Sequence, residues 1–389
     1  MHGGSGDEIG IDEEGPVLGL IGGGQLGRML AQAAAPLGVG VIVADPTPDC
    51  PAAAVAREQV VGGFGDRETI DTVAERADVL TYEIELVDAD ALAMVAEGRG
   101  VPVHPSPDTL RMTQDKLAEK RQLEAADVPV PAFRAVDDEA DLEAAFDALG
   151  SPLMLKARRG GYDGRGNAPA GSVDEARAEF GDLTGLVAEA FVSFDRELSV
   201  IGVRGRDEVT TFPAAENRHE AEILRETVAP ARTADPVLDR ADAIAGRVLE
   251  RLDGRGVFGI ELFEVDGEVL VNEIAPRPHN SGHYTIEGAV TSQFALHVRA
   301  VLGWPLGSTA LRCPAVMANI LGSGASRRAQ LRGVDVVLQR PGTSLHWYGK
   351  REVRPRRKMG HVTCIPTVDE GRDELLASAR ELVAALSFA

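Results

Sequence analysis

Two glutamates in neighbouring apolar segments are the strongest candidates for metal chemistry. Glu261 lies within residues 258–263 and Glu273 within residues 269–274, and these segments are expected to form a β-hairpin. A carboxylate inside an apolar strand needs a partner, because burying an unpaired charge is costly. Two carboxylates can together hold Mg²⁺, which bridges phosphate oxygens. The pair therefore predicts a metal site, and two exposed strand glutamates are the alternative interpretation.

The loop of this hairpin decides whether the two glutamates share a face, because side chains alternate along a strand. A two-residue loop at 266–267 would place Glu273 on the face opposite to Glu261. A three-residue loop at 265–267 would make them diagonal neighbours on one face, roughly 7–8 Å apart between backbones. Gly267 suits the left-handed position that ends such a loop. We therefore expect the three-residue loop, with both carboxylates facing one site.

A glycine-rich loop follows an expected strand that ends in Lys156. Residues 160–166 contain four glycines, and arginines stand at positions 158, 159 and 165. Free N–H groups and cations on a flexible loop can close over a polyphosphate. The spacing differs from G-x-x-x-x-G-K-[ST], which excludes a P-loop. The alternative is a long hairpin turn with a basic rim.

The first glycine turn of the chain, made by Gly22, Gly24 and Gly27, lies between an expected strand and an expected helix. Asp45 ends the next expected strand. Together they match the local fingerprint of a nicotinamide dinucleotide site. A phosphorylated substrate at the helix N-terminus is the competing interpretation.

Two further segments are candidates for a functional site, and the second is strongly basic. Residues 276–283 read PRPHNSGH, and residues 346–361 read HWYGKREVRPRRKMGH. A basic cluster is usually a solvated face, but the second segment is a basic island in a chain of net charge −21. A phosphate monoester fits the fork of an arginine side chain. We therefore expect the second segment to bind a specific anion.

The elements that would position these residues begin with the β–turn–α–β order of a doubly wound sheet. The expected strands are residues 17–21, 39–44, 79–83, 153–156, 186–189, 197–201, 258–263 and 269–274. The expected helices are residues 28–37, 109–126, 235–252 and 370–386.

Composition excludes several classes of protein. The 389 residues are 44% hydrophobic and hold no low-complexity tract, which excludes disordered and collagen-like chains. No apolar run approaches the ~20 residues of a membrane span. Residues 1–15 lack the features of a signal peptide and are expected to be a frayed acidic leader. The three cysteines are far apart and not in metal-binding spacing, which is typical of reduced thiols in a cytoplasmic protein.

The charge balance is strongly acidic and poor in lysine. A net charge of −21 speaks against a general nucleic-acid coat. Only five of the 40 basic residues are lysines. Such a surface suits a high-salt cytoplasm, where screening removes self-repulsion, and an ordinary acidic cytosolic protein is the alternative. Because lysines are scarce, those that remain are better candidates for chemistry.

With these residues in hand, the chain resembles the ATP-grasp superfamily and, within it, the 5-(carboxyamino)imidazole ribonucleotide synthases of purine biosynthesis. The resemblance covers residues 16 to about 365 and keeps the family's motif order. It rests on GGGQLGRML at 22–30, TYEIE at 81–85, QDK at 114–116, RGGYDGRG at 159–166, AENRH at 215–219, NEIAPRPHNSGH at 272–283 and the segment 346–361.

The resemblance implies a fold of mixed α/β and α+β type, with three domains. These are a Rossmann-like pre-ATP-grasp domain at 16–111 after the leader at 1–15, an ATP-grasp domain at 112–305, and a small β-rich C-terminal domain at 306–389. It also implies a cytoplasmic homodimer, with no nucleic-acid or membrane partner. The implied reaction converts ATP, bicarbonate and 5-aminoimidazole ribonucleotide into the carboxyamino product, ADP and phosphate, through carboxyphosphate.

Site roles carry over from the family position by position. The implied ATP-site residues are Lys116, Lys156, Gly161, Tyr162, Asp163, Gly164, Arg165, Gly166, Asn167, Glu189, Ala190, Phe191, Val192, Glu197, His219, Asn272 and Glu273. The implied substrate-site residues are Gln25, Leu26, Glu83, Glu85, Arg277, His279, Ser281, Lys350, Arg354, Arg357 and Lys358. The implied catalytic residues are Lys156, Tyr162, Asp163 and Arg277. Glu261 and Glu273 would bind Mg²⁺, with Mn²⁺ able to substitute.

The chain departs from the family pattern at two motif positions and in its acidic leader, which has no counterpart, and three rival functions stay open. The usual Phe-Glu-Asn after Thr-Tyr-Glu is Ile84-Glu85-Leu86, and the common metal asparagine is Ala275. A formate-dependent glycinamide ribonucleotide transformylase is the first rival. A nicotinamide oxidoreductase is the second, although it leaves the glycine-rich loop at 160–166 and the glutamate pair unexplained. A non-catalytic nucleotide sensor is the third, and the intact Lys156, Glu261 and Glu273 argue against it.

Overall fold

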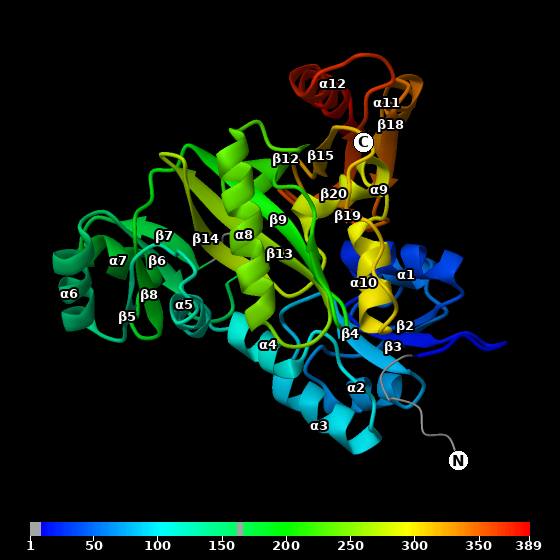
Figure 1. The fold of residues 1–389 in the computed structure, drawn as a ribbon, viewed down its shortest axis with the longest axis horizontal. Helices are drawn as coiled ribbons and strands as arrows, with labels where there is room; N and C mark the ends of the chain where they lie inside the picture. The colour runs from blue at the N-terminus through cyan, green and yellow to red at the C-terminus, as the bar shows by residue number, and fades with distance from the viewer. Residues whose placement is uncertain (1–8, 162–165) are drawn as a thin grey trace.

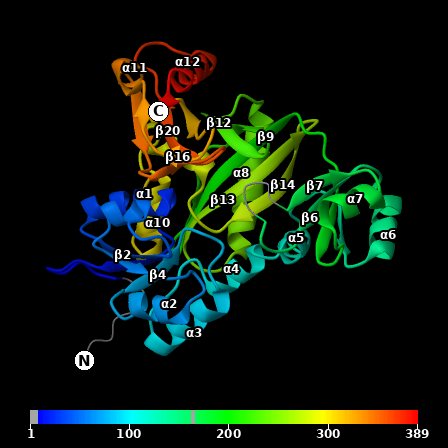
Figure 2. The same cartoon turned by 180° about the vertical axis from the view of Figure 1, so that it is seen from behind.

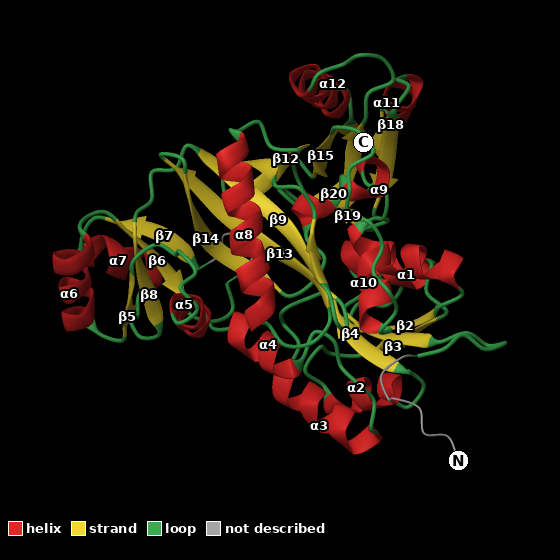
Figure 3. Ribbon diagram, viewed as in Figure 1, coloured by secondary structure: helices red, strands yellow, loops and turns green. Residues whose placement is uncertain are grey.

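The computed structural model describes residues 9–161 and 166–389. Most of its strands form a parallel sheet near the N-terminus, a small antiparallel sheet and a large antiparallel sheet (Figure 1), and the others form two short two-stranded sheets. Helices lie against each of the three larger sheets (Figure 3). The expected combination of α/β and α+β architecture is confirmed.

The N-terminal unit is the doubly wound sheet that the β–turn–α–β pattern predicts. Its strand order is β3-β2-β1-β4, all parallel. Hydrophobic side chains of α1 cover one face, and those of α2 and α3 cover the other. Its elements are β1 (Val17–Ile21), α1 (Gln25–Ala34), a 3₁₀ turn (Ala35–Leu37), β2 (Gly40–Asp45), a second 3₁₀ turn (Pro51–Ala54), β3 (Glu58–Val61), α2 (Arg67–Ala74), β4 (Val79–Tyr82) and α3 (Ala89–Arg99).

Two helices, α4 (Pro107–Thr113) and α5 (Lys116–Glu124), lead from this unit to the rest of the chain. The single helix expected over 109–126 is wrong. The chain breaks because the Asp115 carboxylate caps α5, accepting the amides of Leu117 and Ala118. The Gln114 side chain also turns back and donates to the carbonyls of Glu85 and Val87. Lys116 is thereby the first residue of its own helix.

A small antiparallel sheet with order β5-β8-β6-β7 follows α5. One face packs on two helices through a core of its own. Its elements are β5 (Phe133–Val136), α6 (Glu139–Leu149), β6 (Leu153–Ala157), β7 (Asn167–Ala170), α7 (Val173–Phe180) and β8 (Leu186–Ala190). The glycine-rich loop joins β6 to β7, so it is the hairpin connection of this sheet.

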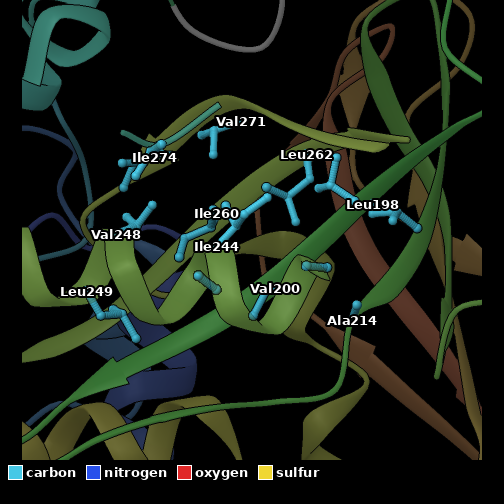
Figure 4. Close-up of a cluster of buried hydrophobic side chains, with 14 of the residues drawn as sticks. Leu198, Val200, Ala214, Ile244, Val248, Leu249, Ile260, Leu262, Val271 and Ile274 are labelled. Carbon is cyan, nitrogen blue, oxygen red and sulfur yellow. The ribbon is translucent and has the colours of Figure 1, made fainter. Parts of the chain in front are cut away.

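The large sheet has the order β14-β13-β9-β11-β12-β15-β20-β18, and β10 pairs with β9. Helix α8 (Asp235–Arg251) lies across one face, and its apolar side chains pack on β9, β13 and β14 (Figure 4). The strands are β9 (Arg196–Arg204), β10 (Val209–Thr211), β11 (Ala215–Glu220), β12 (Ile223–Ala229), β13 (Gly256–Val265), β14 (Glu268–Ala275), β15 (Ala315–Leu321), β18 (Thr343–Trp347) and β20 (Lys358–Cys364).

The C-terminal segment extends the large sheet, since β15 pairs with β12 and then with β20. Helix α12 packs on β15 and β20 and matches the expected closing helix. Helix α10 lies between α1 and the strands β9 and β13, so it joins the N-terminal unit to the large sheet. The remaining elements are a 3₁₀ turn (Asn280–Gly282), α9 (Thr285–Gly288), α10 (Gln293–Val301), β16 (Arg327–Arg328), β17 (Leu331–Arg332), α11 (Val334–Gln339), β19 (Glu352–Val353), α12 (Arg372–Ala384) and β21 (Ser387–Phe388).

The described part of the leader is attached to the fold at Ile9. Its amide donates to the carbonyl of Leu302, and its carbonyl accepts from the indole N–H of Trp304. The expectation of a frayed leader is therefore wrong at this residue. All three cysteines are free, as expected. No helix among the described residues has the length and hydrophobicity to cross a membrane.

Candidate active site

The hairpin that carries the two glutamates turns through two residues. Val265 pairs with Glu268, which leaves Asp266 and Gly267 as the loop. Both have positive φ, 50° and 80°, as a type I′ turn requires, and Asp-Gly is a preferred sequence for that turn. The Asp266 amide donates to the Asp195 carboxylate at 2.9 Å. The expected three-residue loop is wrong, because aspartate tolerates the left-handed region that the tighter turn needs.

A β-bulge restores the shared face that the tight turn would have removed. Leu262 pairs with Val271, but the next pair along is Glu261 with Glu273. Asn272 is the extra residue, and two residues of β14 there oppose one of β13. The expectation that the glutamates share a face is confirmed, and they lie directly opposite each other rather than diagonally.

The charges around the two glutamates differ. The Lys116 ammonium lies 2.7 Å from Glu273 and holds the pKa of Glu273 well below its usual range. Burial, together with the neighbouring Glu273 charge, raises the pKa of Glu261 to about 7. The His279 imidazole Nε2 is 3.3 Å from the Glu261 carboxylate. Burial also lowers the pKa of His279 to about 3, so this ring is a neutral partner.

Two carboxylates at such a spot fit a divalent cation, because a cation would offset the charge that burial disfavours on Glu261. The described residues contain no cluster of three or more His, Cys, Asp or Glu side chains that could hold a metal by themselves. A cation here would complete its coordination with oxygens of a bound ligand or water, as Mg²⁺ commonly does.

A buried lysine network lies beside the glutamate pair. Strand β14 is at the edge of the large sheet, and this edge lies next to the small sheet (Figure 2). The Lys156 ammonium donates to the Asn272 side chain at 2.9 Å and lies 3.0 Å from Glu189. Lys120 contacts the other oxygen of Glu189 at 3.4 Å. Burial alone would raise the pKa of Glu189, but the two lysines lower it. Lys156 on β6, Glu189 on β8 and Asn272 on β14 are thus connected in one network of ion pairs and hydrogen bonds.

The expected adenine and ribose side chains occupy the end of β8 and the start of β9. Glu189 and Ala190 end β8, and the Phe191 side chain that follows is 44% exposed. Val192 comes next in the same connection. Glu197 on β9 bonds His219 on β11 at 2.8 Å. Burial alone would lower the pKa of His219, but the Glu197 hydrogen bond outweighs it and raises the pKa.

Part of the expected lid lies outside the described residues, namely Tyr162, Asp163, Gly164 and Arg165. Gly161 and Gly166 border that gap, and Asn167 begins β7 opposite Lys156. The Arg158 side chain bonds Asp115 with two nitrogens, and its carbonyl accepts the Lys116 amide. The base of the loop is therefore attached to the start of α5.

The first glycine turn has two carboxylates on its amides. Gly23 donates to Asp45 at 2.9 Å and Gly24 donates to Glu83 at 2.7 Å. Burial raises the pKa of Glu83 to about 7. A side-chain carbon added at Gly22 would come within 2.8 Å of Glu83, so the glycine permits this close approach. These carboxylates accept the amides that would otherwise be free to bind a dinucleotide phosphate, which disfavours the nicotinamide interpretation.

The expected substrate residues converge only in part. The Arg277 guanidinium lies 3.0 Å from Glu85, which joins β14 to the N-terminal unit. His279 bonds the Ser281 hydroxyl at 2.8 Å. The charge of Lys358 on β20 opposes the rise in the pKa of Glu261 and adds to the fall in the pKa of His279.

The other basic residues of the C-terminal segment take different partners. The Lys350 ammonium lies 5.8 Å from the Tyr348 ring centroid. Its charge opposes the rise in the pKa of Glu83 that burial causes. Arg354 pairs with the Glu352 carboxylate, and Arg357 donates to the Glu352 carbonyl. On the N-terminal unit, Gln25 and Leu26 begin α1, and Leu26 packs into the core. A phosphate site shared by all these side chains stays a prediction.

Sequence reasoning missed two buried charges on α5, Glu119 and Lys120. Burial raises the pKa of Glu119 to about 8 and lowers that of Lys120 to about 8. A signal was present, because Lys120 is one of five lysines and stands four residues after Lys116, on the same helix face.

Three segments of the chain match described families. Residues 16–114 match the ribonucleotide synthetase preATP-grasp domain, residues 121–294 the ATP-grasp domain, and residues 315–374 the phosphoribosylaminoimidazole carboxylase C-terminal domain. The N5-carboxyaminoimidazole ribonucleotide synthase of Brucella melitensis is 42% identical over 357 residues, which span 90% of this chain and 96% of the relative.

Solved structures of such synthases have the same fold. The one from Thermus thermophilus is 44% identical with a TM-score of 0.83, covering 95% of this chain and 97% of that one. The one from Aspergillus clavatus, in complex with ADP and 5-aminoimidazole ribonucleotide, is 35% identical with a TM-score of 0.87, covering 95% and 99%. Similarity of this extent shows that the chain belongs to the N5-carboxyaminoimidazole ribonucleotide synthase family of ATP-grasp proteins.

Proposed function

We propose that this protein is an ATP-dependent ligase that carboxylates 5-aminoimidazole ribonucleotide with bicarbonate in purine biosynthesis. The products are 5-carboxyaminoimidazole ribonucleotide, ADP and phosphate. The observation that carries the proposal is that the expected ATP-site residues and the expected ribonucleotide-site residues lie next to each other at Glu261. Glu261 lies beside the lysine network and contacts His279. The charge of Lys358, which belongs to the basic segment, acts on the pKa of both groups. A polyphosphate and an anionic second substrate would therefore be held next to each other.

The chemistry begins with bicarbonate, which is a poor electrophile. A bicarbonate oxygen attacks the γ-phosphorus of ATP and the bond to ADP breaks, giving carboxyphosphate. The exocyclic amine of the ribonucleotide then forms a C–N bond to the carboxyl carbon, directly or after release of CO₂, and loses a proton as phosphate departs. Lys116 and Lys156 would neutralise charge on the phosphates. Residues 161–167 would exclude water from the labile intermediate.

Glu261 and Glu273 would hold Mg²⁺ or Mn²⁺, which supplies positive charge to the phosphate oxygens. The support is the direct pairing of the two glutamates and the raised pKa of Glu261. On the substrate side, Arg277, His279 and Ser281 would orient the ribonucleotide, with Glu83 and Glu85 lining its base. Lys350, Arg354, Arg357 and Lys358 would surround its phosphate. Tyr162 and Asp163 would act beside the reacting amine.

The deciding experiment measures phosphate release from ATP. We expect release to require both 5-aminoimidazole ribonucleotide and bicarbonate. Replacing this pair by glycinamide ribonucleotide and formate tests the transformylase alternative in the same assay. Release that depends on formate, or that ignores both substrates, would contradict the proposal.

Three properties of the whole protein complete the proposal. It would act as a homodimer in the cytoplasm, with domains at 16–111, 112–305 and 306–389. Its acidic, lysine-poor composition would adapt it to high salt. Sedimentation of the purified protein tests the dimer, and a monomer at working concentration would contradict it.

A further inference from the structure

The bulge at Asn272 determines where Glu273 points. Before the bulge, Val269 and Val271 of β14 face the core under α8, and after it Ile274 does. The spacing between core-facing residues thus changes from two to three. Without the extra residue the two-residue turn would pair Ile260 with Glu273 and send the carboxylate into the apolar core. The glutamate pair therefore depends on a feature that the turn alone does not produce.

Helix α5 holds this bulge from the side. Lys120 is 1% exposed, and its ammonium donates to the Asn272 carbonyl at 2.8 Å and the Val271 carbonyl at 3.3 Å. These are the carbonyls of the bulged residue and its predecessor. A bulge disrupts the regular ladder, and buried carbonyls that lose their strand partner need another donor. Lys120 supplies it.

The contacts around Lys120 show how a charged side chain is accommodated there. Its ammonium also lies 3.4 Å from Glu189, whose other oxygen is 3.0 Å from Lys156. Lys156 in turn holds the Asn272 side chain at 2.9 Å. The backbone and side chain of Asn272 are therefore held by two lysines that share one glutamate.

We propose that Lys120 is a positioning residue that holds the Asn272 bulge and thereby keeps Glu273 facing Glu261. It acts through the backbone of β14, one turn of α5 beyond Lys116, which contacts the Glu273 carboxylate directly. The inference rests on the proposed function, because it concerns the geometry of the metal pair. It assigns a role to a residue that the sequence reasoning left without one.

The test compares Lys120→Met, which keeps the length and removes the donor, with Lys120→Gln, which keeps an uncharged donor. Arg121→Met is the matched control, because Arg121 is the exposed neighbour on the same helix. Calorimetry measures ADP affinity with Mg²⁺ and with EDTA. We expect Lys120→Met to lose about tenfold or more of the Mg²⁺-dependent gain in affinity, as changes behind metal ligands commonly do. Its affinity in EDTA should change little, and Lys120→Gln should be intermediate.

Hydrogen exchange gives a readout that does not depend on the metal. Peptides covering residues 268–275 should exchange faster in Lys120→Met than in the parent or the control. If Lys120→Met does not yield folded protein, Lys120→Gln decides by the same two measurements. An unchanged Mg²⁺ effect, or equal losses with Mg²⁺ and with EDTA, would overturn the positioning role. A parent protein whose ADP affinity ignores Mg²⁺ would instead overturn the metal site in the proposed function.

Discussion

Replacing Glu261 by glutamine should stabilise the ligand-free protein at neutral pH while removing its response to Mg²⁺. Burial and the Glu273 charge raise the pKa of Glu261 to about 7 from 4.5. In the native state this group keeps its proton between about pH 4.5 and 7, whereas in the unfolded chain it loses it. The folded state then binds more protons, so the group's contribution to stability falls as pH rises through this window.

The size of the effect follows from the pKa rise. At ~1.4 kcal/mol for each pH unit, the ionised form in the folded protein costs about 3 kcal/mol. The Glu261 side chain is 19% exposed, and solvent reduces the cost to about 1–2 kcal/mol. Glutamine has a similar shape and no charge to bury. For a chain of 389 residues, the variant should therefore melt about 1–3 °C higher at pH values above the pKa.

The assay is thermal unfolding across pH in the presence of EDTA, with Glu268→Gln as control. Glu268 lies on the same hairpin but is exposed, so its replacement should change little. The gain of Glu261→Gln should shrink as pH falls and vanish near the ordinary glutamate pKa, where both proteins carry a neutral group. A gain that is absent above pH ~7, or that persists unchanged at low pH, would refute the reasoning.

Three further predictions concern the same site and the surface. Glu273→Gln should abolish Mg²⁺-dependent ATP cleavage, measured as phosphate release, and should lower the melting temperature because Lys116 loses its partner at 2.7 Å; an active or more stable variant would contradict this. Arg357→Ala should raise the KM for the ribonucleotide by about tenfold or more and the KM for ATP far less, with the exposed Arg332→Ala as control, and equal losses would make the cluster a solvated face. The melting temperature should rise between roughly 0.1 M and 2 M KCl, because salt screens the net charge of −21; an unchanged value would remove the adaptation to salt.

Local pattern accounts for much of the fold. The strand–glycine turn–helix–strand order at 17–45 predicts the doubly wound sheet, because apolar runs and glycines act within a few residues. The hairpin of Glu261 and Glu273 is likewise visible as two apolar segments around Asp-Gly. Boundaries were less accurate, and the break between α4 and α5 was missed. It depends on Asp115, a helix cap whose position inside a helical pattern was readable in the sequence.

The register of this hairpin depends on contacts that a local sequence pattern does not contain. The spacing between Val269, Val271 and Ile274 changes from two residues to three, and this change is the local signal of the bulge. Whether a chain tolerates an irregular ladder, however, depends on donors from elsewhere, here Lys120 and Lys156 from α5 and β6.

The sequence by itself determined which residue types were available: a glutamate pair in apolar strands, a glycine-rich loop after a lysine, and a basic segment in an acidic chain. Tertiary structure alone decided which of them meet. Asp45 and Glu83 occupy the amides of the first glycine turn, which changes the meaning of a motif that reads locally as a dinucleotide site. Glu83 lies 59 residues further along the chain than the Gly24 amide that it accepts. Side chains that are distant in sequence have no local signature of their pairing, because only the packed sheets bring their charges within range.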